Sequence, residues 1–106
     1  MNSEKELLEI MGLANAANAE LEVARINEIE AGETLASQEV DVIQRGLEGS
    51  NQQARDADLL KETEKARGDL AAAKIDCIIK GTQYDNAKRT LWIMQLIYQV
   101  RAEKGE

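Results

Sequence analysis

The sequence predicts an all-α fold, an elongated helical bundle that forms one domain over residues 1–106, and three observations support this prediction. The chain contains no proline and no phenylalanine, and helix-forming Ala, Leu, Glu, Ile, Lys and Gln dominate it. Apolar residues recur three and four positions apart, which is the period of an amphipathic helix. Runs of β-branched or aromatic residues bounded by turn residues, which would indicate strands, are missing from the sequence.

Glycines divide this helical pattern, so we expect three long helices over about 3–31, 52–80 and 83–104 and a short one over about 35–48. Asn2 or Ser3 can cap the first helix, and Gly32 is a natural stop at its end. The main apolar face of this first helix consists of Leu7, Ile10, Ala14, Ala17, Leu21 and Ala24. A weaker second stripe consists of Leu8, Ala19, Val23 and Ile26.

The middle of the chain is expected to break around Gly46, Gly49 and Ser50, after a short helix whose apolar face holds Val40, Ile43 and Leu47. Asn51 then opens the third helix, and Gly81 closes it. The apolar face of the third helix consists of Leu59, Ala66, Leu70, Ala73 and Cys77. Thr82 and Asp85 resemble a capping box at the start of the fourth helix.

The segment 91–100 of the fourth helix, Leu-Trp-Ile-Met-Gln-Leu-Ile-Tyr-Gln-Val, is apolar around most of its circumference and therefore needs cover on two sides. We assign one stripe to the core of the chain itself: Ala87, Leu91, Met94 and Tyr98. We assign a second stripe to a protein partner, most simply a second copy in a homodimer: Trp92, Ile93, Leu96 and Val100. The alternative is a monomer in which the other helices surround this one.

Acidic residues are concentrated in the N-terminal part of the chain, where residues 1–41 hold ten acids and two bases. This balance argues against direct nucleic-acid binding by that part, because phosphate affinity comes from clustered Lys and Arg. It leaves open a basic partner protein. The carboxylates expected to form such an acidic interaction face are Glu20, Glu22, Glu28 and Glu30.

The sequence offers few residues for catalysis, and we expect a protein that is not an enzyme and that binds no cofactor. The chain has no histidine, which removes the commonest general base and the usual zinc-binding signatures. Cys77 lies on an apolar face without a histidine to activate it, as a structural cysteine does. Gly46 and Gly49 lack the Lys-Ser/Thr of a phosphate-binding loop.

Two carboxylate pairs, Glu6 with Glu9 and Glu30 with Glu33, have the spacing that can hold Mg²⁺ on a helix. This spacing resembles the carboxylate motifs of the all-α nucleotide pyrophosphohydrolases, which would imply a metal-dependent activity. The companion ExxD motif of that family is missing here. The two pairs also lie about 36 Å apart on the expected first helix, too far to share an ion. We therefore predict no metal site.

Residues 1–9 do not have the pattern of a signal peptide, and no apolar run approaches the roughly 20 residues that span a bilayer. With a single cysteine as well, we expect a cytoplasmic protein that does not contact membranes. The predicted function is protein–protein interaction, as an adaptor, chaperone or assembly factor. The alternative is an acidic inhibitor of the phage or mobile-element type, which blocks a basic nucleic-acid-binding surface on a host protein, as anti-restriction and anti-CRISPR proteins do.

Overall fold

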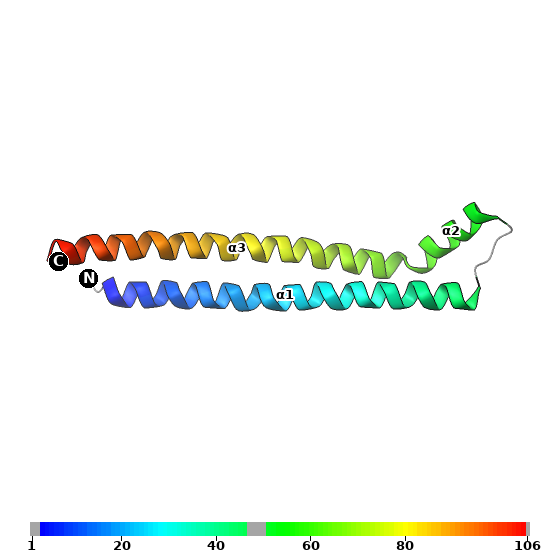
Figure 1. Cartoon of the computed structure of the whole chain (residues 1–106), viewed down its shortest axis with the longest axis horizontal. Coiled ribbons are helices and arrows are strands. Elements are labelled where there is room, and N and C mark those ends of the chain that lie inside the picture. The colour runs from blue at the N-terminus through cyan, green and yellow to red at the C-terminus, as the bar shows by residue number, and fades with distance from the viewer. Residues whose placement is uncertain (1–2, 47–50, 106) are drawn as a thin grey trace. The chain divides into compact units, whose positions relative to one another are not determined.

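A computed structural model of the protein describes residues 3–46 and 51–105. These residues form three helices, α1 (Ser3–Arg45), α2 (Gln52–Glu62) and α3 (Glu64–Glu103), which Figure 1 labels. Within the described ranges there is no β-strand. The predicted all-α class is confirmed, and one of the helices is short. The short helix is α2, however, whereas the segment 35–48 expected to form it belongs to the end of α1 as far as Arg45. In that segment Val42 is buried and the predicted Val40 and Ile43 are exposed, and Leu47 lies outside the described residues.

The chain divides into two units, and each contains part of α1 and part of α3. The first unit combines Met1–Val23 with Ile78–Glu106. The second unit is Ala24–Cys77, which includes the whole of α2. In each unit the segment of α1 and the later segment of the chain run alongside each other in opposite directions (Figure 1).

The core of the first unit is a narrow apolar seam. Ala14 and Leu21 of α1 are buried, and Leu7, Ile10 and Ala17 on the same side of the helix are half-buried. The facing residues of α3 are also half-buried: Tyr84, Ala87, Leu91 and Met94. The predicted main faces are thus confirmed in this unit with one difference, since Tyr98 is 40 % exposed and contributes little to the seam.

The seam of the second unit contains Ala24, Val42 and Ala66, which are buried. The predicted face of the third expected helix is confirmed here as well, because its remaining members are half-buried: Leu59, Leu70, Ala73 and Cys77. Among the described residues of this unit, however, the most buried side chain is polar, since Thr63 is only 1 % exposed.

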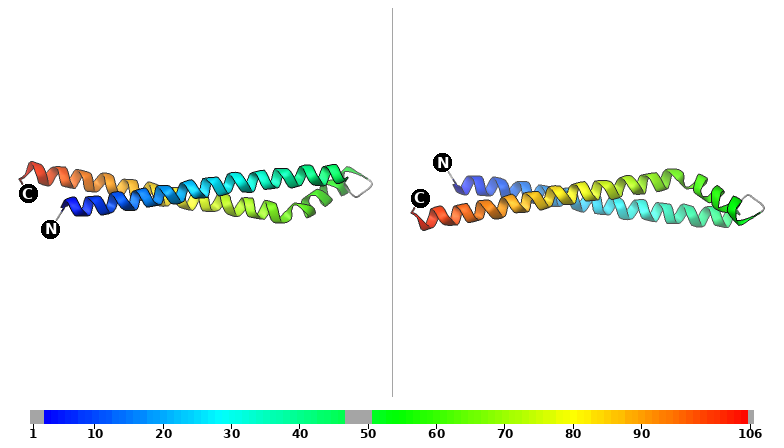
Figure 2. Two further views of the ribbon diagram at one scale, coloured as in Figure 1. Left: turned by 90° about the horizontal axis from the view of Figure 1, so that it is seen from below. Right: turned by 90° about the horizontal axis from the view of Figure 1, so that it is seen from above.

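The predicted helix ends at Gly32 and Gly81 are wrong. α1 continues through Gly32 to Arg45, and α3 continues through Gly81 to Glu103. Both ribbons are uninterrupted in Figure 1, and in Figure 2 the left view shows α1 and the right view shows α3 in front along its length. A glycine inside a helix costs only about 1 kcal/mol relative to alanine, so it does not stop a helix that packing supports. Packing is present at both positions, because an added Cβ would lie 4.0 Å from Leu70 at Gly32 and 3.9 Å from Leu21 at Gly81. The Thr82–Asp85 capping box is wrong for the same reason.

The true break between α1 and α2 lies where the sequence places it. Gly46 has φ +89°, in the left-handed region that glycine adopts without strain, and it follows the last residue of α1. The other predicted break residues, Gly49 and Ser50, lie outside the described residues. Asn51 caps α2 as predicted, because its Oδ1 accepts a hydrogen bond of 2.9 Å from the backbone N–H of Ala54.

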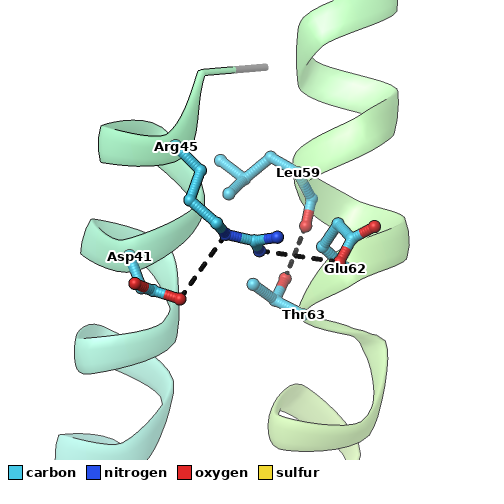
Figure 3. A network of polar contacts seen from close by, with 5 residues as sticks. All are labelled: Asp41, Arg45, Leu59, Glu62 and Thr63. Atoms are coloured by element: carbon cyan, nitrogen blue, oxygen red, sulfur yellow. Dashed lines mark hydrogen bonds and ion pairs between the residues drawn. The ribbon is translucent and has the colours of Figure 1, made fainter. Parts of the chain in front are cut away.

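A break that the sequence did not reveal separates α2 from α3 at Thr63 (Figure 3). The Thr63 hydroxyl donates to the carbonyl of Leu59 at 2.8 Å, and the Arg67 guanidinium donates both to Thr63 Oγ1, at 3.2 Å, and to the carbonyl of Leu60. Side chains that insert into the backbone ladder in this way are a recognised cause of kinks. The expected helix 52–80 is therefore split into α2 and the first part of α3.

Candidate interaction surface

The outer face of α3 in the first unit carries the second apolar stripe that the sequence predicts. Each helical residue turns about 100°, so Ile93, Leu96 and Val100 lie on the side of α3 opposite Leu91 and Met94. All three outer side chains are exposed, whereas Leu91 and Met94 are half-buried in the seam. Leu96 is 42 % exposed and Trp92, beside it, is 62 % exposed. This arrangement gives α3 two apolar faces, only one of which its own chain covers.

A shallow depression marks the C-terminal end of this outer face. It is lined by Leu96, Ile97, Val100, Arg101 and Lys104, so its apolar part comes from three of the exposed aliphatic side chains. Ile97 was not among the predicted interface residues, although its position next to Leu96 on an apolar arc could have suggested it. Aliphatic side chains with cationic neighbours form the kind of patch that excludes water when a helix covers it.

Trp92 lies at the edge of a second shallow depression, which it lines together with Asp85, Lys88 and Arg89. Lys88 is engaged within its own chain, because its Nζ lies 3.5 Å from Asp85 Oδ1 and 4.6 Å from the centre of the Tyr84 ring. The exposed indole thus stands at the border between the apolar face and a polar region. Tryptophan in this position is typical of protein interfaces.

The four carboxylates of the predicted acidic face do not lie on one side of α1. Glu20 and Glu22 are two residues apart, which turns their side chains about 200° from each other, and the same holds for Glu28 and Glu30. Glu20 forms an ion pair with Lys80 of α3, with Oε2 and Nζ 3.5 Å apart. Glu28 is half-buried, whereas Glu22 and Glu30 are exposed. The structure therefore separates these residues rather than gathering them.

Glu28 lies beside Cys77 of α3 in the second unit, and both side chains are half-buried. Partial burial raises the pKa of the Cys77 thiol above its ordinary value of 9.0, and the hydrogen bond to Glu28 and the negative charge of that carboxylate raise it further. A thiol with a raised pKa stays protonated at neutral pH and is a poor nucleophile. This environment supports a structural part for Cys77.

The carboxylate pairs considered for metal binding are spread over the surface of α1. Glu30 and Glu33 line a shallow depression with Thr34, Ser37 and Gln38. Residues 3–46 and 51–105 contain no group of three or more His, Cys, Asp or Glu side chains that could hold a metal ion. In the same ranges, no helix combines the length and the apolar character that crossing a membrane requires.

No known protein family, curated protein or solved structure matches this chain. The surface with the clearest chemistry is the exposed outer stripe of α3, made up of Trp92, Ile93, Leu96 and Val100.

Proposed function

We propose that this protein acts through protein–protein interaction as a homodimer, with the outer stripe of α3 as the contact between the two copies. The observation that carries the proposal is the pair of opposite apolar faces on α3, of which the chain covers the one with Leu91 and Met94 and leaves the other exposed. Burying an aliphatic side chain contributes about 1.5–3 kcal/mol, so three of them favour association.

The dimer would serve as an adaptor, chaperone or assembly factor in the cytoplasm, where a single cysteine such as Cys77 stays reduced. Neither a catalytic step nor a cofactor is part of this proposal. The alternative, an acidic inhibitor that blocks a basic nucleic-acid-binding surface, has less support. Its four carboxylates point to different sides of α1, and two of them, Glu20 and Glu28, interact with α3.

Two substitutions that each place a glutamate on α3 test the proposal. Leu96→Glu should give a folded monomer and weaken dimerisation at least about 100-fold, because two copies each lose an apolar contact and each tenfold corresponds to about 1.4 kcal/mol. Leu91→Glu should instead unfold the chain, since its carboxylate would be placed in the seam without a partner. Sedimentation equilibrium and circular dichroism measure the two effects.

Gln95→Glu is the matched control, because it adds the same charge to an exposed position about 100° around the helix from Leu96. It should leave both the dimer and the helical content unchanged. A monomeric wild-type protein would overturn the proposal. So would a Leu96→Glu variant that unfolds as fully as Leu91→Glu, because the outer stripe would then belong to the core of the chain.

A further inference from the structure

Little packing anchors α2 to the rest of the second unit. None of its residues is buried, and its first seven, Gln52–Asp58, include no apolar side chain larger than alanine. Glu62 forms an ion pair with Arg45 of α1 at 3.8 Å, but the two side chains are 45 % and 59 % exposed (Figure 3). An exposed ion pair contributes little to stability. The orientation of α2 therefore depends mainly on its junction with α3.

Two side chains at this junction hold α2 at an angle to α3. Thr63 has φ −105° and ψ 9°, and it belongs to neither helix. In an unbroken α-helix the Leu60 carbonyl would accept a hydrogen bond from the backbone N–H of Glu64, four residues later. Here the Arg67 guanidinium donates to that carbonyl, and its Nε donates to Thr63 Oγ1 at 3.2 Å. The Arg67 side chain thus caps the C-terminal end of α2.

The sequence across the junction is also compatible with one continuous helix. Residues 52–67 contain no glycine and no proline. The inward-facing residues keep the helical spacing of four, three and four through the junction: Leu59, Thr63, Ala66 and Leu70. If Arg67 moved away, the Glu64 N–H could take its place at the Leu60 carbonyl, so that carbonyl has a donor in either arrangement. Arg67 is exposed, so its release does not require the seam to open.

We propose that α2 is a hinged segment with two positions, in which Thr63 is the hinge and Arg67 decides the position. In the first position, which the structure shows, Arg67 caps α2 and the chain bends at Thr63. In the second position Arg67 is released, and α2 joins α3 in one helix over residues 52–103. Because α2 has no buried residue, this change sacrifices no fully buried contact of α2, and it exchanges one hydrogen bond to Leu60 for another. The inference does not depend on the proposed dimer, since the junction lies within the second unit.

Spin labels on α2 and α3 test the two positions. In a Cys77→Ser background, Gln53→Cys and Lys74→Cys place labels at exposed positions 21 residues apart, and one straight helix would separate their Cα atoms by about 32 Å. Pulsed electron–electron resonance should give a shorter distance while Arg67 is present, because the chain bends at Thr63. Arg67→Ala should lengthen the distance toward the straight-helix value.

Lys65→Ala is the matched control for Arg67→Ala. Lys65 is also a cation at the start of α3, but it pairs with Asp69 of the same helix, with Nζ and Oδ2 3.6 Å apart. Its removal should leave the shorter distance unchanged. Equal distances for Arg67→Ala, Lys65→Ala and the unchanged junction would overturn the proposal, because Arg67 would then not decide the position of α2.

Hydrogen exchange provides a second measurement that needs no labels. In the Arg67→Ala variant the Glu64 amide should exchange at least about tenfold more slowly, since it gains the bond to the Leu60 carbonyl. Circular dichroism should show no loss of helix. Unchanged exchange at Glu64 would overturn the proposal. So would faster exchange throughout residues 52–64 with a loss of helical signal, because α2 would then unfold without Arg67 instead of joining α3.

Discussion

The two units are built from the same kind of helix pair but differ in where they place their polar and apolar residues. The seam of the first unit is aliphatic and aromatic, from Leu7 to Leu21 on α1 and from Tyr84 to Met94 on α3. The seam of the second unit includes polar groups, namely the hydrogen-bonded pair Glu28–Cys77 and the buried Thr63. Among the described residues, twelve exposed large hydrophobic side chains belong to the first unit and six to the second.

Polar contacts also connect the helix ends of the second unit. Arg45, in the last turn of α1, lies 3.5 Å from Asp41 and 3.8 Å from Glu62 of α2 (Figure 3). No buried side-chain nitrogen or oxygen in the described parts of the chain lacks a hydrogen-bond partner. Satisfied polar groups restrict which helix positions can face each other, since any other register would leave them unpaired. The second unit thus has polar groups in its seam and at its helix ends, whereas the first exposes more apolar side chains.

The largest expected effect is a difference in the free energy of unfolding between two variants of the first unit, one at a leucine in the seam and one at a leucine on the surface of α1. Leu21→Ala should lower the free energy of unfolding by about 2–4 kcal/mol, because Leu21 is only 5 % exposed and its loss leaves a cavity. Leu13→Ala should change it by less than about 0.5 kcal/mol, since Leu13 is 66 % exposed. Urea denaturation of the two variants at low protein concentration measures both. Equal losses would contradict the assignment of the seam to Leu21 rather than Leu13.

A smaller loss of stability is expected from changes at Thr63, where α2 meets α3 in the second unit. Thr63→Val keeps the shape of the side chain but removes the hydroxyl that bonds Leu59 and Arg67, and it should cost about 1 kcal/mol. Thr63→Ser keeps the hydroxyl and should cost roughly half as much or less. Thermal or urea unfolding compares the pair. A Val variant at least as stable as the Ser variant would mean that the hydroxyl does not hold the α2–α3 junction.

The smallest expected effect is a change in the alkylation rate of Cys77, the thiol of the second unit. The negative charge of Glu28 raises the pKa of Cys77, so the Glu28→Gln substitution should lower that pKa. Because the thiolate is the reactive form, alkylation of Cys77 at pH 8 should become about two- to tenfold faster. Asp76→Asn, which removes a weaker influence on the same thiol, should have a smaller effect, and Cys77→Ser should abolish labelling. A Glu28→Gln rate equal to that of the wild type would contradict the contact.

Because the pKa of Cys77 is raised in the folded protein, the stability of the fold should fall at high pH. Folding favours the protonated thiol, so its contribution is complete below the ordinary value of 9.0 and is lost as the pH rises through the higher folded value. The wild-type protein should therefore lose stability above pH 9 more steeply than the Glu28→Gln variant. Denaturation curves between pH 7 and pH 11 measure this difference.

The sequence by itself determined the helical class and most of the inward faces. Residues three and four apart on a helix share a side, so the spacing of Leu7, Ile10, Ala14 and Leu21 identified a seam without knowledge of its partner. The cap at Asn51 was also predictable, because it depends on hydrogen bonds to neighbours in the chain. The exposed outer stripe of α3 followed from the same periodicity, but periodicity does not say what covers a face.

Tertiary packing decided where the helices end and which polar residues lie inside. Gly32 and Gly81 have the same local propensity as Gly46, yet α1 and α3 run through the first two, beside leucines of the opposite helix, and α1 ends before the third. The break at Thr63 depends on the Arg67 side chain, and the inward position of Glu28 depends on Cys77, which is 49 residues away in the sequence. Propensity is a local free energy of about 1 kcal/mol per residue, and contacts between distant residues outweigh it wherever two helices meet.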